Sequence, residues 1–160
     1  MTFKDQYGNE HEVNPSDVAI QWRISVYGVV TREDNKLLML QPHFNPQWQF
    51  PGGKVEINET VDETLKREFL EEVGYKIDTH EKEFVFINEQ NFFDDYNKQY
   101  YHSLQLLYKV KLADLKQYPE FIETGEGMDY GKVGWIEIDT LTEKNVQHTH
   151  WPVIRLLETS

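Results

Sequence analysis

The sequence contains no cysteine, which excludes disulfide bonds, thiolate catalysis and zinc sites built on thiolate ligands. It has no apolar run as long as a membrane-spanning helix, and its first residues do not read as a signal peptide. Positive charge is scarce, because 16 Lys and Arg stand against 28 Asp and Glu, giving a net charge of −12. Proteins that bind long nucleic acids carry basic patches. We therefore expect a cytoplasmic protein with neither a long nucleic acid nor a membrane as its partner.

The remaining composition is that of a folded domain. Apolar residues make up 39% of the 160 positions and aromatic residues 14%, which is enough to build one hydrophobic core. We find neither internal repeats nor low-complexity linkers, so we expect residues 1–160 to form a single domain. Its negative charge would repel a polyphosphate substrate unless a divalent cation reversed the local field.

One stretch, from Pro51 to Tyr75, carries most of the chemical information. A Pro-Gly-Gly loop leads into a helical pattern in which Val61, Leu65, Phe69 and Val73 recur every four residues. Asn58 or Glu59 can cap the start of this helix, and Gly74 suits the left-handed position after its end. The segment therefore predicts a glycine-rich loop packed beside a capped amphipathic helix.

Three carboxylates lie on one arc of this predicted helix. Glu68, Glu71 and Glu72 have the i, i+3, i+4 spacing of neighbours on a helix surface. Such a cluster is stable when it is well solvated or when a cation binds to it, and its hard oxygen ligands suit Mg²⁺ or Mn²⁺. A solvated acidic face is the simpler reading of this spacing alone. The adjacent apolar stripe and the glycine loop favour the cation site.

The same stretch resembles the signature of the Nudix (MutT-like) hydrolase family. That signature is Gly, five residues, Glu, seven residues, Arg-Glu, an apolar residue, one residue, Glu-Glu, one residue, Gly and a further apolar residue. Every defined position is filled within residues 53–75, by Gly53, Glu59, Arg67-Glu68-Phe69, Glu71-Glu72 and Gly74-Tyr75. The upstream sequence Trp48 to Gly52 is similar to the lead-in of the family.

The resemblance implies roles for these residues. Glu68, Glu71 and Glu72 become metal ligands, together with the backbone carbonyl of Gly53, and Glu68 also becomes a candidate general base. Arg67 pairs with Glu59 or Glu63 rather than with substrate, and the family pattern makes Glu59–Arg67 the brace between loop and helix. The cofactor expected from the resemblance is Mg²⁺ or Mn²⁺.

The flanking sequence predicts strands before and after the box. Residues 2–6 and 10–13 flank Tyr7-Gly8-Asn9 as a hairpin, and residues 1–17 read as an accessory N-terminal piece. Apolar residues, which alternate with polar ones from Ile20 to Val26, predict strands at 20–30, 37–40, 84–87, 103–111 and 133–138. A last helix follows Thr149 or His150, with Pro152 in its first turn. We expect an α/β fold with helices on both sides of a mixed sheet, and the resemblance implies the Nudix α/β/α sandwich plus the N-terminal hairpin.

Two further regions hold candidate functional residues. We read residues 112–131 as one long connection containing Gly125, Gly127 and Gly131, and such connections are often functional. Among its acids Glu123, Glu126 and Asp129, we select Glu126 as an auxiliary catalytic base, with three ordinary surface acids as the alternative. Phe92, Phe93 and Tyr96 follow the box at the interval where some Nudix proteins place residues that select substrate. Stacking on a base and plain core packing both remain open for them.

The leading hypothesis is metal-dependent hydrolysis of a phosphoanhydride bond in a nucleoside diphosphate linked to another group. Nucleoside triphosphates, damaged ones included, are prominent candidates, and a homodimer is possible. The alternative is a catalytically weak Nudix-fold domain that binds a nucleotide as a sensor. Such domains usually lose carboxylates of the box, whereas this sequence retains all of them.

Overall fold

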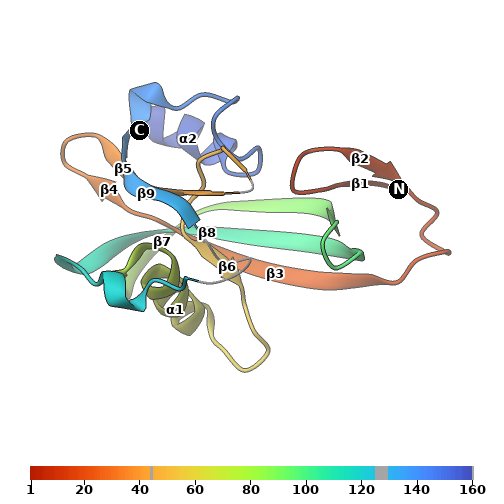
Figure 1. Ribbon diagram of the computed structural model, residues 1–160, viewed down its shortest axis with the longest axis horizontal. Helices are drawn as coiled ribbons and strands as arrows, with labels where there is room; N and C mark the ends of the chain where they lie inside the picture. The colour runs from red at the N-terminus through yellow and green to blue at the C-terminus, as the bar shows by residue number, and fades with distance from the viewer. Residues whose placement is uncertain (44, 125–129, 160) are drawn as a thin grey trace.

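The computed structural model describes residues 1–43, 45–124 and 130–159. Its architecture is α/β, with strands gathered into a curled, mixed sheet and helices on opposite sides of it (Figure 1). Helix α1 (Val61–Val73) lies on one side and helix α2 (Trp151–Glu158) on the other. The expected layering of helix, sheet and helix is confirmed. No helix within the described residues is long and apolar enough to cross a membrane.

The strands form two hydrogen-bonded sheets. The larger one has the order β2 (Glu10–Glu12), β1 (Thr2–Lys4), β7 (Tyr75–Asp94), β8 (Gln99–Gln117), β3 (Ile20–Val29) and β6 (Gly52–Lys54). The smaller one has the order β4 (Thr31–Arg32), β5 (Lys36–Pro42) and β9 (Tyr130–Glu137). The β3–β8 and β1–β7 pairs are parallel and the other pairs are antiparallel, so the sheet is mixed as expected. Two short 3₁₀ helices, η1 (Pro119–Phe121) and η2 (Ile138–Thr140), complete the elements.

Alternation along the strands divides the interior into two cores. In β5, Leu37 and Met39 face the core under α2, whereas Leu38 and Leu40 face the core under α1. A strand whose residues point alternately to two buried faces reads as a continuous apolar run. This is why β5 shows no hydrophobic alternation in the sequence.

Helix α1 is held by its predicted apolar stripe. Leu65, Phe69 and Val73 are fully buried, and each contributes roughly 1.5–3 kcal/mol relative to exposure. Gly74 ends the helix in the left-handed conformation with φ 71°, as predicted. The predicted start was wrong. Thr60 is the N-cap, and its side chain accepts a hydrogen bond from the backbone N–H of Glu63. The Glu63 carboxylate in turn accepts from the backbone N–H of Thr60, which completes a capping box.

The predicted N-terminal hairpin is present as β1 and β2, and it docks on the end of β7 (Figure 1). The Asp5 carboxylate organises its turn, accepting from the backbone N–H groups of Tyr7 and Asn9, the Asn9 side chain and His11 Nε2. Burial raises the pKa of Asp5, but these donors outweigh it and set that pKa to about 2. Phe3 is fully buried and packs edge-on against Tyr100 at 5.0 Å. The hairpin is therefore an integral part of the fold.

Two other predictions need correction. Residues 112–131 are not one long connection, because β8 continues to Gln117 and η1 follows it. The sequence showed β7 and β8 only in part, since both contain bulges where pairing shifts register. At the last helix, Pro152 lies in the first turn and His150 is the N-cap residue, but its side chain makes no capping bond. His150 is instead fully buried, and its Nδ1 accepts from the backbone N–H of Phe50 at 3.0 Å.

Candidate active site

The glycine loop reaches the helix through strand β6. Gly52 pairs with Tyr27 and Gly53 pairs with Val26 of β3, so the loop lies directly on the sheet. Gly52 has φ 146°, a conformation that favours glycine, and a Cβ there would lie 2.1 Å from the carbonyl oxygen of Val26. Only glycine allows this close approach of the two backbones.

A buried carboxylate fixes the loop to the helix. Glu72 is 4% exposed, and its Oε2 accepts a hydrogen bond of 2.8 Å from the backbone N–H of Gly52. A buried amide without an acceptor is costly, so this bond holds the two segments in register. This contact was not predicted from the sequence, where the spacing of Glu72 indicated only metal binding.

Arg67 is the centre of the carboxylate cluster. Its guanidinium donates to both oxygens of Glu59, at 2.6 and 3.0 Å, in a bidentate pair. It also donates to Glu68 at 3.1 Å and to Glu71 at 3.0 Å. The hydrogen bonds from Arg67 lower the pKa of Glu59 to about 2, and the Thr64 hydroxyl assists by donating to the same carboxylate. Glu63 takes no part in this pairing, because it belongs to the capping box.

Glu68 lies between the helix and the loop. Its side chain is 13% exposed, and a Cβ at Gly53 would lie 2.4 Å from its Oε1. The absence of a side chain at position 53 therefore creates the space that this carboxylate fills. Burial raises the pKa of Glu68, Arg67 counteracts that effect, and the negative charge of Glu71 adds to it.

The donor chemistry of this cluster fits a hard divalent cation. Glu68, Glu71 and Glu72 supply only carboxylate oxygens, and the Gly53 backbone lies against Glu68. Among the described residues, however, no three acidic or histidine side chains are gathered tightly enough to hold an ion as they stand. The Arg67 guanidinium contacts both Glu68 and Glu71 in this arrangement. Binding a cation would therefore require these carboxylates to turn from Arg67.

The predicted aromatic residues have three different environments. Phe92 lies on β7, stacks on Tyr101 with ring centroids 6.4 Å apart, and lines a cavity. Phe93 is 7% exposed and packs between the His11 and Tyr100 rings, so it belongs to the docking of the hairpin. Tyr96 is 90% exposed in the turn between β7 and β8. The three residues do not form one surface.

Glu126, the candidate loop base, and Asp129 lie outside the described residues. Glu123 is described, is exposed, and donates its backbone N–H to the carbonyl of Glu71 at 2.8 Å. This bond ties Glu123 to the last turns of α1.

Comparison with known proteins identifies the family. A family model described as NUDIX domain matches residues 21–157, most of the chain. The chain belongs to the Nudix family. The matched span includes every residue of the cluster around Arg67, and Nudix hydrolases generally use divalent metals and act on small nucleotide substrates.

Individual Nudix relatives are similar over shorter segments. A MutT-like protein of Streptomyces ambofaciens is 40% identical over 65 residues, which cover 41% of this chain and 42% of that protein. An 8-oxo-dGTP diphosphatase of Proteus vulgaris is 39% identical over 54 residues, covering 31% of this chain and 48% of that protein. The chain thus matches less than half the length of these relatives.

A solved structure extends the likeness to the fold. The structure of a Nudix hydrolase from Nitrosomonas europaea has a TM-score of 0.62 and 20% identity, covering 86% of this chain and 87% of that one. At this identity the likeness shows the fold alone. It agrees with the helix–sheet–helix arrangement described above.

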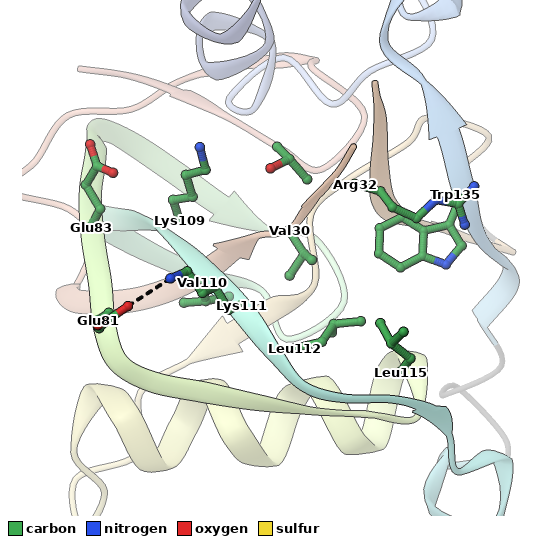
Figure 2. Close-up of a pocket in the computed structure, with 11 residues that line it drawn as sticks. Val30, Arg32, Glu81, Glu83, Lys109, Val110, Lys111, Leu112, Leu115 and Trp135 are labelled. Atoms are coloured by element: carbon green, nitrogen blue, oxygen red, sulfur yellow. Dashed lines mark hydrogen bonds and ion pairs between the residues drawn. The ribbon is translucent and has the colours of Figure 1, made fainter. Parts of the chain in front are cut away.

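Several cavities lie outside the carboxylate cluster of this Nudix domain, and one of about 400 Å³ is bordered by the N-terminal hairpin, β7 and His148. Another, about 490 Å³, is bordered by Val30, Leu112, Leu115 and Trp135 together with charged residues of β7 and β8 (Figure 2). Two of its charged residues, Lys111 and Glu81, form an ion pair at 2.8 Å, and both are well exposed.

A third cavity, about 150 Å³, is lined by polar residues of the sheet face opposite α1, including Arg23, Tyr27 and Gln105. This polar face was not predicted from the sequence, although polar residues alternate with apolar ones along β3.

Proposed function

We propose that this chain hydrolyses a phosphoanhydride bond in a nucleoside diphosphate linked to another group, with nucleoside triphosphates among the candidates. The observation that carries the proposal is the half-buried carboxylate cluster on α1, fixed to the glycine loop through Glu72 and Gly52 and organised by Arg67. Carboxylates concentrated at a helix face beside a close-packed backbone loop fit the handling of a phosphate group with a divalent cation.

The cation proposed is Mg²⁺ or Mn²⁺, held by Glu68, Glu71 and Glu72 with the carbonyl of Gly53. When bound, it would neutralise charge on the phosphoryl oxygens and lower the pKa of a coordinated water. Glu59 and Arg67 serve as the brace, because their bidentate pair joins the loop before α1 to the middle of the helix. The brace does not contact the reacting groups in this proposal.

Two carboxylates are candidates for the general base. Glu126 lies between two glycines in the sequence, and a loop carboxylate that does not bind the metal would be freer to accept a proton. Glu68 is the second candidate, since burial raises its pKa toward the range in which a carboxylate accepts a proton effectively.

The alternative function is a catalytically weak nucleotide sensor. It is disfavoured because all of the acidic residues of the box are retained and are positioned by specific hydrogen bonds. The net charge of −12 argues against a long nucleic acid as partner. A single domain, a cytoplasmic location and a possible homodimer remain part of the proposal.

A panel of substrates assayed with Mg²⁺, with both products identified, tests the proposed function. It should include nucleoside triphosphates, 8-oxo-dGTP and nucleoside diphosphates linked to a sugar. We expect cleavage between two phosphorus atoms, with a nucleotide as one product. Binding of nucleotides without turnover of any of them would favour the sensor instead.

A further inference from the structure

Strand β3 extends beyond the short strand that covers its outer side. It pairs with β8 along its whole length on one side, whereas on the other side β6 pairs only with residues 25–27 (Figure 1). The backbone N–H of Val55 extends this contact to the carbonyl of Ile24. Among the described residues, no strand pairs with positions 20–23 on that side. The sheet therefore ends there in an open strand edge.

The backbone groups that face this open edge belong to Ile20 and Trp22. The Ile24 carbonyl accepts from Val55 at 2.9 Å, so the even-numbered residues of β3 direct their backbone groups away from β8. Residues of a strand direct these groups alternately to its two sides. The N–H and C=O groups of Ile20 and Trp22 therefore point into the space beside β3, whereas those of Gln21 point toward β8. Such a row of donors and acceptors is a template for another strand.

The two edges of this sheet differ in how they are protected. Strand β2, at the opposite edge, has three residues, and two of them are the glutamates Glu10 and Glu12. Short, charged edge strands discourage pairing with another chain. Positions 20–24 of β3 read Ile-Gln-Trp-Arg-Ile. Their one charged side chain, Arg23, lies over two aromatic rings of β7 and β8 and lines the polar cavity on the other face. The β3 edge is therefore open to pairing.

The side chains beside the open edge are apolar and exposed. Trp22 is 66% exposed and Ile24 is 44% exposed. The Trp22 ring stacks on His102, with centroids 4.4 Å apart and planes 14° apart, so it lies flat on the sheet with its outer face in solvent. Ile87 is 47% exposed and extends the same face onto β7. Exposed apolar surface of this kind marks a site of interaction with another protein surface.

We infer that a second copy of this chain occupies the edge, through antiparallel pairing of the two β3 strands about a two-fold axis beside Gln21. In this register the backbone groups of Ile20 in one copy meet those of Trp22 in the other, in both directions. Trp22 then lies beside the partner's Ile20, an aromatic and β-branched pair of the kind that stabilises sheets. Because β3 begins at Ile20, each partner strand leaves the sheet about where Val55 joins it.

The charges of the edge favour an identical strand as the occupant. Antiparallel pairing separates the two Arg23 side chains and directs each toward the end of the partner strand that follows Asp17, an exposed acid. No acidic residue lies between Ala19 and Ile24, so acids do not oppose acids. The net charge of −12 per chain repels a second copy at long range, and added salt screens this repulsion. The inference rests on the homodimer included in the proposed function, and not on hydrolysis.

Two variants test the interface, each with a matched control. Trp22→Lys places a charge at the edge, whereas Leu115→Lys makes the same change at an 89% exposed position of β8. Ile20→Pro removes a backbone donor that faces the partner, and proline is tolerated at the first residue of a strand. Ile20→Val keeps that donor and the β-branched side chain. Sedimentation velocity without nucleotide, over a series of protein concentrations, gives the mass, and circular dichroism confirms that each variant is folded.

We expect the wild type to pass from the mass of one chain to twice that mass as its concentration rises, and the dimer to tighten with added salt. Its melting temperature should rise with concentration as well. Trp22→Lys and Ile20→Pro should weaken dimerisation on the order of tenfold or more, while both controls match the wild type. Hydrogen exchange of the Ile20 and Trp22 amides should slow on dimerisation far more than that of the Gln21 amide, which faces β8.

The interface and the proposed hydrolysis can fail separately. A wild type that remains monomeric at every concentration would overturn the interface even if hydrolysis is robust. A dimer that is unchanged in Trp22→Lys or in Ile20→Pro would overturn it as well. A dimer that both variants dissociate, but that cleaves no nucleotide, would support the interface and overturn the proposed hydrolysis instead.

Discussion

Substituting the two adjacent glycines of the loop separates catalytic geometry from stability. At position 53 an added Cβ would lie 2.4 Å from Glu68 Oε1, whereas ordinary van der Waals contact begins at 3.4 Å. The carboxylate of Gly53→Ala must therefore move by roughly 1 Å. Because the atom that yields is the end of a flexible side chain, the fold should tolerate the change with a cost below about 1 kcal/mol.

The loss of activity should be much larger than the loss of stability. A displacement of roughly 1 Å in a group that positions the reacting atoms costs about 100-fold in rate. We expect kcat of Gly53→Ala to fall by about that factor, and its melting temperature to stay within a few degrees of the wild type.

Gly52→Ala should behave in the opposite way. Its Cβ would lie 2.1 Å from the Val26 carbonyl oxygen and 2.6 Å from Tyr27 Cα, both backbone atoms, at φ 146°. Backbone strain and overpacking together cost about 2–6 kcal/mol, or roughly 5 to 20 °C in melting temperature for a domain of this size. Thermal denaturation and steady-state kinetics of Gly52→Ala and Gly53→Ala test both expectations. Wild-type kcat in well-folded Gly53→Ala would refute the placement of Glu68.

Three further predictions concern the acidic residues. The pKa of Glu59 is lowered to about 2 from an ordinary 4.5, so the stability it contributes is present above pH 4.5 and lost as pH falls toward 2. The difference in melting temperature between the wild type and Glu59→Gln should therefore shrink as the pH falls from 4.5 toward 2. A difference that stays constant with pH would argue against the ion pair between Glu59 and Arg67. Glu72→Gln keeps an acceptor for the Gly52 amide and should melt near the wild type. Glu72→Ala should lose about 1–3 kcal/mol of unfolding free energy in denaturant titrations. Equal stability of these two variants would refute the role of that hydrogen bond. Glu126→Gln should lower kcat and shift the acid limb of the pH–rate profile while Glu123→Gln does little; wild-type kinetics in Glu126→Gln would leave Glu68 as the base.

The box region was predictable because its signals are local. The apolar stripe ending at Val73 and the left-handed Gly74 depend on spacing and backbone chemistry that are visible within one helix. The start of the helix was misplaced because three consecutive polar residues, Asn58, Glu59 and Thr60, can each cap it. Thr60 is the cap because Glu63 lies three residues after it and completes a capping box with it.

The contacts that assemble the site were less visible because they join distant segments. The bond between Gly52 and Glu72 depends on how β6 lies on the sheet, and the burial of His150 depends on the backbone of Phe50. Likewise, the polar cavity requires the register that aligns Arg23 with Ser103. The periodicity within one segment does not determine how two strands that are distant in the sequence align with each other.

Metal-dependent turnover of a nucleotide tests the central claim most directly. The best substrate from the panel would be assayed with Mg²⁺, with excess EDTA, and again after Mg²⁺ is restored. Because Glu68, Glu71 and Glu72 supply only hard oxygen ligands, we predict that hydrolysis disappears with EDTA and returns with Mg²⁺. Full turnover in excess EDTA would contradict the account.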